Sequence, residues 1–250
     1  MLLTIDIGNT NISLGVFEGE ELVRHWKISS FQRPDGEYGA AIKGLFSSSG
    51  LDMRGVKGSV ICSVVPRLDG VFRKALEGFS PRIVGADIDA GIPVLVDNPS
   101  EVGADRLVNA VAGYNRHGRA LIIVDLGTAI TFDYVTMKGE YAGGVIAPGI
   151  GISSEALFEK TARLPKVELQ RPARVVGTHT ADCIRSGLFW GFVGLMDGII
   201  ERMLGEVGED PLVIATGGDA ALFAGESRFI KETDEFLTLR GLRIIHEGNA

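Results

Sequence analysis

The sequence predicts an α/β protein with two related lobes, each a mixed sheet flanked by helices. Three observations carry this prediction. An apolar strand that ends in Asp, a tight Gly-containing turn and a second alternating strand occur at 2–16 and again at 121–135. The two aspartates, Asp6 and Asp125, lie 125 − 6 = 119 positions apart, about half of the 250 residues. Strand-like apolar runs alternate with helix-like segments along the rest of the chain.

A polar break at 116–119 separates the two predicted lobes. The prediction places the N-terminal lobe at 1–115 and the C-terminal lobe at 116–250. A chain of this length has room for two small domains, each with a buried core. The second hairpin follows the break directly, so each predicted lobe starts with its own copy of the repeated pattern.

The N-terminal lobe opens with the first hairpin and a third strand at 22–28. Hydrophobic periodicity and turn residues predict the remaining elements. In chain order these are a helix at 35–45, a buried strand at 58–65, a helix at 68–79, a short strand at 82–84 and an extended segment at 92–96.

The last helix of this lobe carries polar residues on one side. Ser100 is a good N-cap for this helix. Helical spacing separates two groups, with Ala104, Leu107, Val108 and Val111 on the apolar face and Asp105, Arg106 and Asn109 opposite. The polar group has two interpretations: an ordinary solvated face, or a general base beside an anion clamp.

The C-terminal lobe continues from the repeated hairpin into a glycine-rich stretch at 142–151. Its glycines and proline predict a loop rather than a long regular element. The elements predicted after it are a helix at 153–161, an irregular segment at 165–172, a long apolar helix through Ile184 to Leu204 with Thr178 or Thr180 as its cap, a buried strand at 212–216, a helix at 220–223 opened by Gly217-Gly218-Asp219, and an extended segment at 236–245.

Four glycines interrupt the long apolar helix at three- and four-residue spacing: Gly187, Gly191, Gly194 and Gly198. Such a stripe makes a smooth groove for close helix packing, either within the subunit or across a dimer. The apolar residues around it predict that the helix is deeply buried in the core.

Composition excludes several classes of protein. The formal net charge of −7 argues against a nucleic-acid binder, which needs a basic face. Two cysteines far apart form no disulfide framework, and the four histidines lack zinc-ligand spacing. The first apolar run stops at Asp6, without a basic segment before it, and no apolar run is long enough to cross a bilayer. A cytoplasmic protein without a membrane partner is expected.

The duplicated turn has the chemistry of a phosphate site. Gly8 lets the backbone approach a ligand, Asn9 to Asn11 offer donors, and Asp6 can reach a hydrated Mg²⁺. A single turn of this kind is equally compatible with an ordinary hairpin. Two copies of the turn, one per lobe, favour binding of the polyphosphate of a nucleotide.

Nine short motifs then occur in the order found in one known family. They are DIGNT at 6–10, DGEY at 35–38, CSVVP at 62–66, NPSEVGADR at 98–106, DLGTA at 125–129, GGVIAPG at 143–149, TARLP at 161–165, HTADCIRSG at 179–187 and TGGDA at 216–220. On these motifs, nearly the whole chain resembles the type III pantothenate kinases of the acetate and sugar kinase, actin and heat-shock chaperone superfamily. The resemblance implies two ribonuclease-H-like lobes with the active site in the cleft between them.

The same resemblance implies the reaction: ATP-dependent phosphorylation of pantothenate to 4'-phosphopantothenate, the first step of coenzyme A biosynthesis. The implied ATP residues are Asp6, Ile7, Gly8, Asn9, Thr10, Asn11, Ile12, Ser13, Thr128, Gly217 and Gly218. The implied pantothenate residues are Gly103, Ala104, Asp105, Arg106 and Thr180, with Asp105 as the base. Asp6 would lie near Mg²⁺ through water, and Asp125 would help bind a monovalent cation, K⁺ or NH₄⁺. Members of the family are homodimers with the pocket close to the subunit interface.

The sequence departs from the family pattern at one substrate contact. The family often has a tyrosine where Val96 stands, so the acceptor could be another small molecule on the same scaffold. A second alternative is a nonenzymatic protein, because some relatives were first described as accessory factors to transcription regulators. Retention of Asp6, Asp105 and Asp125 favours an enzyme over a binding module.

Overall fold

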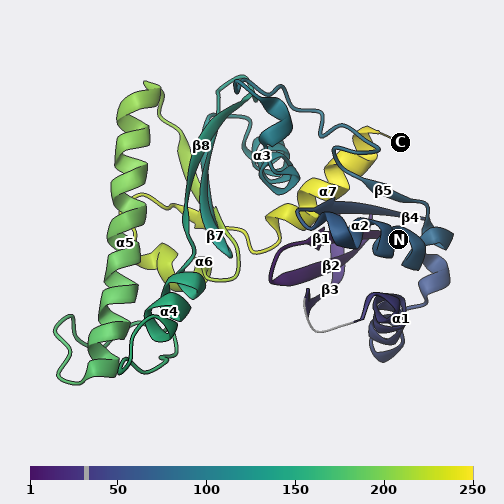
Figure 1. The fold of residues 1–250 in the computed structure, drawn as a ribbon. Helices are drawn as coiled ribbons and strands as arrows, with labels where there is room; N and C mark the ends of the chain where they lie inside the picture. The colour runs from purple at the N-terminus through teal and green to yellow at the C-terminus, as the bar shows by residue number, and fades with distance from the viewer. Residues whose placement is uncertain (31–33, 250) are drawn as a thin grey trace. The chain divides into compact units, whose positions relative to one another are not determined.

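The computed structural model describes residues 1–30 and 34–249, and the chain divides into two compact units. Unit 1 comprises 1–93, 97–116 and 237–250, and unit 2 comprises 94–96 and 117–236 (Figure 1). The main division after Arg116 lies one residue beyond the boundary that the sequence suggested. Two segments belong to the unit opposite to the one that the sequence suggested. The last helix, within 237–250, belongs to unit 1, and the short piece 94–96 belongs to unit 2.

The sheet of unit 1 has five strands in the order β3-β2-β1-β4-β5. The first three pair antiparallel, and β1 pairs parallel with β4, as β4 does with β5. The predicted hairpin and the three further strands of this lobe are confirmed. Their bounds are β1 Leu2–Ile7, β2 Asn11–Glu18, β3 Glu21–Ser29, β4 Gly58–Ser63 and β5 Pro81–Ile83.

Helices cover both faces of this sheet. They are α1 Tyr38–Ser48, α2 Pro66–Ala75, α3 Ala104–His117 and α7 Leu237–Gly248. Leu3, Ile5 and Ile7 of β1 share a core with α1 and α2. Val60 and Cys62 of β4 share a second core with Val108 of α3 and Leu242 of α7. Because strand side chains alternate, these two cores lie on opposite faces of the sheet.

Unit 2 repeats the same topology with the strand order β8-β7-β6-β9-β10. Again a three-stranded antiparallel part continues into two parallel neighbours. The prediction of two related lobes with mixed sheets is therefore confirmed. The bounds are β6 Leu121–Leu126, β7 Ala129–Val135, β8 Tyr141–Pro148, β9 Leu212–Thr216 and β10 Glu232–Thr233.

The helices of unit 2 are α4 Ile150–Glu159, α5 Thr180–Val207 and α6 Ala220–Phe223. Ile122 and Val124 of β6 share one core with Phe189 and Met196 of α5 and with Phe223 of α6. The residue that follows Val124, Asp125, points to the other face of the sheet because of the strand alternation. The chain thus places α5 and α6 behind the sheet, on the face away from the Asp125 side chain.

Three sequence predictions of secondary structure are wrong. The stretch at 142–151 is mostly strand β8, because it pairs with β7 and Gly143 adopts φ +109° beside a break in the register. The segment at 236–245 is helix α7, which Figure 1 shows running along β1. Ser100 lies in a 3₁₀ turn, Pro99–Glu101, so it does not cap α3. In the first two cases tertiary pairing and burial overrode a short, ambiguous local pattern.

Helix α5 also differs from its prediction. Its 28 residues include an 18-residue window with a mean hydropathy of 1.3, long and apolar enough to cross a membrane, which the sequence analysis had excluded. Half of that window is buried inside the protein, and its buried residues belong to the core of unit 2. The helix is therefore a core helix, as the sequence predicted, but its burial is less deep than expected because half of that window is not buried.

Candidate active site

Asp6 lies at the C-terminal end of β1, beside a parallel strand. It pairs in register with Ser13 of β2 and with Cys62 of β4. Alternation along β1 puts Asp6 on the same face as Leu2 and Thr4, opposite the core that α1 and α2 cover. The carboxylate therefore belongs to the face on which Cys62 and the α3 residue Val108 meet.

The turn after Asp6 is braced by the backbone. Gly8 N–H donates to the Asn11 carbonyl at 3.0 Å, and the Ser30 hydroxyl donates to the Gly8 carbonyl at 2.6 Å. Asn9 and Thr10 are exposed at the tip. Ile7 and Ile12 are fully buried in the core, so only their backbone groups are placed to serve a ligand. The turn is a rigid loop with an exposed tip, as a phosphate-binding turn requires.

The buried Cys62 pairs in register with Asp6 and shares a core with Val108 of α3, the helix that carries Asp105 in its first turn. Burial, together with the negative charges of Asp6, Asp105 and Asp69, raises the pKa of the Cys62 thiol well above its usual value. Unit 1 therefore brings together the two carboxylates that the sequence predicted, one from β1 and one from α3. Sequence reasoning missed Asp69, in the first turn of α2, although its position just after the CSVVP motif was a signal. Its Oδ1 is buried and has no hydrogen-bond partner among residues 1–30 and 34–249.

Asp105 occupies the first turn of α3, and burial raises its pKa. The Arg106 backbone N–H donates to Asp105 Oδ1 at 2.9 Å, and the Arg106 charge also favours the ionised form, so both effects oppose that rise. Asp105 and Arg106 are partly buried, and Asn109 is only 1% exposed. The interpretation of this side of α3 as a solvated face is therefore wrong, because Asn109 accepts a hydrogen bond from Thr238 of α7 at 2.8 Å.

Gly103 precedes α3 and makes room for the Asp105 carboxylate. A Cβ atom added to Gly103 would lie 2.5 Å from Asp105 Oδ1, a separation that real Cβ atoms essentially never show. The Gly103 carbonyl also accepts hydrogen bonds from the N–H groups of Arg106 and Leu107, at 3.1 and 3.4 Å. A side chain here would have to push the carboxylate out of its position.

The resemblance implies that Asp105 is the base of a phosphorylation reaction. On that role we expect Gly103→Ala to lower kcat by about a hundredfold, because a 1 Å misplacement of a reacting group costs about that much. Affinity for ATP should stay within about twofold of the parent protein, as measured by calorimetric titration. Gly44→Ala in α1 is the matched control, since no atom of the described residues outside the helix backbone lies within 4 Å of the added Cβ. Unchanged kcat in Gly103→Ala would show that this glycine does not position Asp105.

Unit 2 carries the second turn in the same form. Gly127 N–H donates to the Ala129 carbonyl at 3.0 Å, which repeats the bond made by Gly8. Gly149 N–H donates to the Thr128 carbonyl at 3.2 Å, and Thr128 itself is exposed. A Cβ on Gly149 would collide with the Gly127 and Thr128 carbonyls, so α4 starts in direct contact with this turn.

The turn at Gly217 packs against the start of this second turn, beside Asp125 and Leu126. Gly217 has φ +93°, and a Cβ added to it would lie 2.6 Å from both Asp125 Oδ1 and the Leu126 carbonyl oxygen. Gly218 follows at the exposed start of α6. Unit 2 therefore brings together Asp125, Thr128 and the Gly217-Gly218 turn. The Asp125 carboxylate and the Leu126 carbonyl both lie close to Gly217, and oxygen donors of these types bind hard cations.

The predicted pantothenate residues are divided between the units. Gly103 to Arg106 belong to unit 1, whereas Thr180 is the exposed first residue of α5 in unit 2. The N-cap of α5 is His179, without a side-chain capping bond, so the predicted threonine cap is wrong. Val96 also belongs to unit 2, where Leu95 N–H donates to the Tyr141 carbonyl of β8 at 2.8 Å.

No dedicated metal cage is present in the described part of the chain, which has no group of three or more His, Cys, Asp and Glu side chains able to hold an ion. Kinase sites do not need such a cage, because Mg²⁺ is held by one or two carboxylates together with substrate phosphates. Asp6, at a strand end beside an exposed turn, fits that requirement.

Comparison with known proteins identifies the family. The profile of a family described as type III pantothenate kinase matches residues 2–202. A relative of that name from Geotalea daltonii is 52% identical over 100% of this chain and 99% of the relative. Another from Geobacter sp. strain M21 is 52% identical over 100% of both chains. The chain belongs to the type III pantothenate kinases. It is a phosphotransferase that phosphorylates pantothenate in coenzyme A biosynthesis, as the resemblance implied.

Solved structures with lower identity share the fold. The inorganic polyphosphate/ATP-glucomannokinase of Arthrobacter sp. strain KM gives a TM-score of 0.54 at 15% identity, covering 100% of this chain and 99% of that one. The activator of the 2-hydroxyisocaproyl-CoA dehydratase of Clostridium difficile, solved with bound ADPNP, gives 0.54 at 13% identity and covers 99% and 96%. These likenesses confirm the predicted two-lobe fold of the superfamily.

Proposed function

We propose that this pantothenate kinase transfers the γ-phosphoryl group of ATP to the hydroxyl of pantothenate, with Asp105 as the general base. The observation that carries the proposal is that Asp6 pairs in register with Cys62, which packs against α3, the helix with Asp105 in its first turn. A predicted phosphate residue and a predicted acceptor residue therefore lie on neighbouring elements of one unit. Phosphoryl transfer needs positioning and charge neutralisation more than covalent help. A carboxylate beside a phosphate turn supplies the positioning of the attacking hydroxyl.

Residues of both units bind the same ATP in this proposal. The backbone and small side chains of Asp6 to Ser13 bind its phosphates, and Thr128 binds from the second turn. Gly217 and Gly218 bind the adenosine side. The support is that both turns are held by the same backbone bond and end in exposed polar residues, Thr10 and Thr128. Neither turn contains a lysine, so backbone N–H groups supply the field for the phosphates.

Asp105 accepts the proton of the pantothenate hydroxyl as that hydroxyl attacks. Burial raises its pKa, which makes it a stronger base than an exposed aspartate, while the Arg106 N–H and the Arg106 charge favour its ionised form. Arg106 is placed beside it to hold the carboxylate of pantothenate by charge-assisted hydrogen bonds. Gly103, Ala104 and Thr180 complete the proposed acceptor site.

Two cations belong to the proposal. When bound, Mg²⁺ near Asp6 and K⁺ or NH₄⁺ near Asp125 neutralise the negative charge that the phosphates carry. On the protein side, Asp6 orients the water molecules of the hydrated metal. Asp125 and the Leu126 carbonyl supply the oxygen ligands on the side of Gly217.

We further propose a cytoplasmic homodimer formed through α5. Outside the backbone of α5 itself, no atom of the described residues lies within 4 Å of a Cβ added to Gly187, Gly191 or Gly194, so the described residues leave this part of the stripe uncovered. A Cβ added to Gly198 would lie 3.3 Å from Arg202 Nη1. The stripe borders a hollow of about 620 Å³, beside which Val175 and Val176 are 65% and 76% exposed. Exposed apolar side chains next to a glycine groove support packing of this helix across a dimer rather than within the subunit.

The direct test is an assay of the purified protein with ATP, Mg²⁺, K⁺ and pantothenate. Phosphopantothenate should form in a one-to-one ratio with ADP, as detected by mass spectrometry, and light scattering of the same sample should report the mass of a dimer. If ADP is released only with another small alcohol as acceptor, that alcohol is the substrate and pantothenate is not. ATP binding without turnover on any acceptor would favour the nonenzymatic alternative.

Removal of the monovalent cation should lower activity by at least about tenfold. The reason is that neither turn carries a lysine to neutralise the phosphates, so the site near Asp125 has to supply the charge. The measurement is the initial rate in K⁺, NH₄⁺ or Na⁺ salts at constant ionic strength. Asp125→Asn should lose the response to K⁺. Equal rates in all three salts would contradict the cation site.

A further inference from the structure

The helix that follows the Gly217-Gly218 turn is too short to be stable without contacts to other elements. Helix α6 has four residues, and the 3₁₀ turn Ala224–Glu226 comes directly after it. A helix of one turn has almost no stability alone, because nucleation costs more than a few hydrogen bonds return. The position of residues 217–228, here called the α6 segment, therefore depends on side chains from other elements.

Two anchors of the α6 segment are in the middle of it. The Phe223 ring stacks on Phe189 of α5 with 5.0 Å between centroids, and both side chains are fully buried. Glu226 accepts a hydrogen bond from Arg171 Nε at 2.6 Å. The first contact is apolar and makes no directional hydrogen bond, and the second involves an arginine that is 58% exposed. Neither one fixes the far end of the segment.

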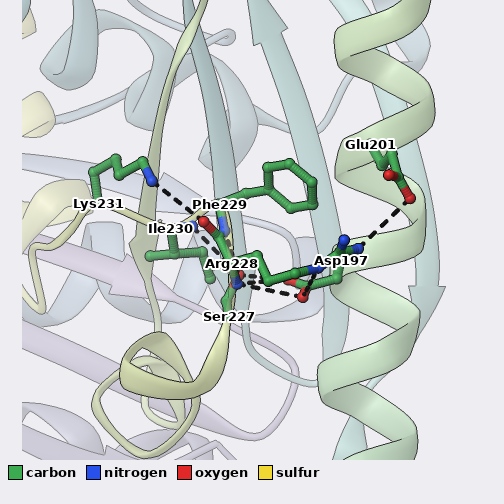
Figure 2. Close-up of polar contacts among 7 residues, drawn as sticks. All are labelled: Asp197, Glu201, Ser227, Arg228, Phe229, Ile230 and Lys231. Atoms are coloured by element: carbon green, nitrogen blue, oxygen red, sulfur yellow. Dashed lines mark hydrogen bonds and ion pairs between the residues drawn. The ribbon is translucent and has the colours of Figure 1, made fainter.

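The third anchor, Asp197, fixes that end by directional bonds. Asp197 is a carboxylate on α5 and is only 6% exposed. It accepts hydrogen bonds from Ser227 Oγ at 2.6 Å, from the Arg228 backbone N–H at 3.2 Å and from Arg228 Nε at 3.0 Å. Figure 2 shows these bonds converging from one side of the loop on a single turn of α5. A buried carboxylate needs such donors, so it holds the loop in one place.

Arg228 also forms an outer ion pair with Glu201, which is exposed to solvent, unlike the bonds to Asp197. Arg228 Nη2 lies 3.5 Å from Glu201, one turn further along α5, and the two side chains are 62% and 59% exposed. Exposed pairs of this geometry contribute little, because solvent screens them. Asp197 and Glu201 thus contact the same arginine from the same helix, one buried and one solvated, which gives an internal control.

We propose that Asp197 is a positioning residue for nucleotide binding, which acts by fixing the α6 segment so that the Gly217-Gly218 turn keeps the shape that receives the adenosine side of ATP. The inference rests on the proposed function, which assigns adenosine to this turn. A glycine turn recognises its ligand through backbone shape alone, so no side-chain adjustment compensates for a shift of the segment. The phosphate turn at Asp6 belongs to the other unit, and the turn after Asp125 has its own backbone bonds from Gly127 and Gly149, so the main effect is expected on the adenosine side.

Asp197→Asn is expected to raise the KM for ATP by about tenfold. It keeps the size of the side chain but turns a donor toward Arg228 in place of an acceptor. The values of kcat at saturating ATP and of KM for pantothenate should change by less than about twofold. Inhibition by tripolyphosphate, which lacks the adenosine, should be unchanged. Glu201→Gln is the matched control and should leave every constant at the parent value.

Ser227→Ala provides a second, milder variant, which removes the 2.6 Å bond and should raise the KM for ATP about threefold. An unchanged KM for ATP in both variants, or in Ser227→Ala alone when Asp197→Asn does not fold, would overturn the inference. Equal weakening of ATP and tripolyphosphate would overturn it as well, because the effect would then be a general loss of structure. Parent protein that neither binds ATP nor phosphorylates pantothenate would instead overturn the proposed function.

Discussion

Asp105→Asn should lower kcat by a factor of about 10² to 10⁴, the range that a positioned general base contributes. Asparagine keeps the shape of the side chain and the acceptor for the Arg106 N–H, but it takes no proton from a hydroxyl. Affinity for ATP should be retained, because the predicted nucleotide residues lie on other elements. Single-turnover kinetics with detection of phosphopantothenate measures the chemical step directly.

The pH dependence of the parent protein follows from the same residue. Burial raises the pKa of Asp105, and the base works only when ionised, so kcat should fall as the pH drops through a value above about 3.9. That acidic limb should disappear from the residual activity of Asp105→Asn. A limb at the same pH in the variant would assign it to another group, such as Asp6 or Asp69.

The direction in which Asp105→Asn changes the stability of the protein can also be predicted. A carboxyl group whose pKa is raised by folding binds its proton more tightly in the folded state, so its ionised form destabilises the fold at pH values above the raised pKa. Replacement by asparagine removes that destabilisation at neutral pH. The melting temperature of Asp105→Asn at pH 7 to 8 should therefore equal or exceed that of the parent protein, as at other active sites where function opposes stability.

Asp52→Asn is the matched control for this variant. Asp52 lies in the same unit and is 58% exposed, and its Arg54 hydrogen bonds lower its pKa, the opposite of Asp105. The exposed pair contributes little to stability, so kinetics should equal those of the parent protein. Turnover of Asp105→Asn within tenfold of the control would remove Asp105 from the role of base.

The repeated hairpin shows how much the sequence can predict. The pattern around Asp6 and Asp125 correctly predicts both turns and the relation between the units, because a one-residue slip would expose an entire buried face. Helix α7 shows the limit. Leu237, Leu239 and Gly241 alternate as in a strand, and only their burial in unit 1 makes the helix favourable. The partner that buries them is more than a hundred positions away, so local periodicity carries no information about it.

The candidate site shows the same limit. Sequence motifs indicated Asp105 and Asp6, whereas Asp69 had only its place after the CSVVP motif as a signal. Asp197 carries no motif, because its contacts depend on which elements pack around it. Asn109 was grouped with the polar side of α3 by helical spacing, yet α7 covers it. Spacing gives the direction of a side chain on its own helix, whereas a distant segment decides whether that direction is solvent or core.

Gly217→Ala should raise the KM for ATP by at least about a hundredfold. Gly217 has φ +93°, a conformation in which an L-residue loses about 1–2 kcal/mol. Its added Cβ would also lie 2.6 Å from the Asp125 carboxylate and from the Leu126 carbonyl oxygen, and the latter is backbone that cannot rotate away. The turn at Gly217 and the second phosphate turn would have to separate, and both are predicted to bind the nucleotide.

A matched control separates this geometry from a general effect of alanine. Gly205→Ala lies on α5, where nothing in the described part of the chain beyond the helix backbone is within 4 Å of the added Cβ. Helix propensity there favours alanine by about 1 kcal/mol. This control should keep the parent kinetics and melt at an equal or higher temperature. Gly217→Ala should in addition respond less to K⁺, because the clash displaces Asp125. If it kept both its KM for ATP and its K⁺ response, the Gly217 turn and Asp125 would not act as one nucleotide site, and the role of unit 2 would reduce to Thr128.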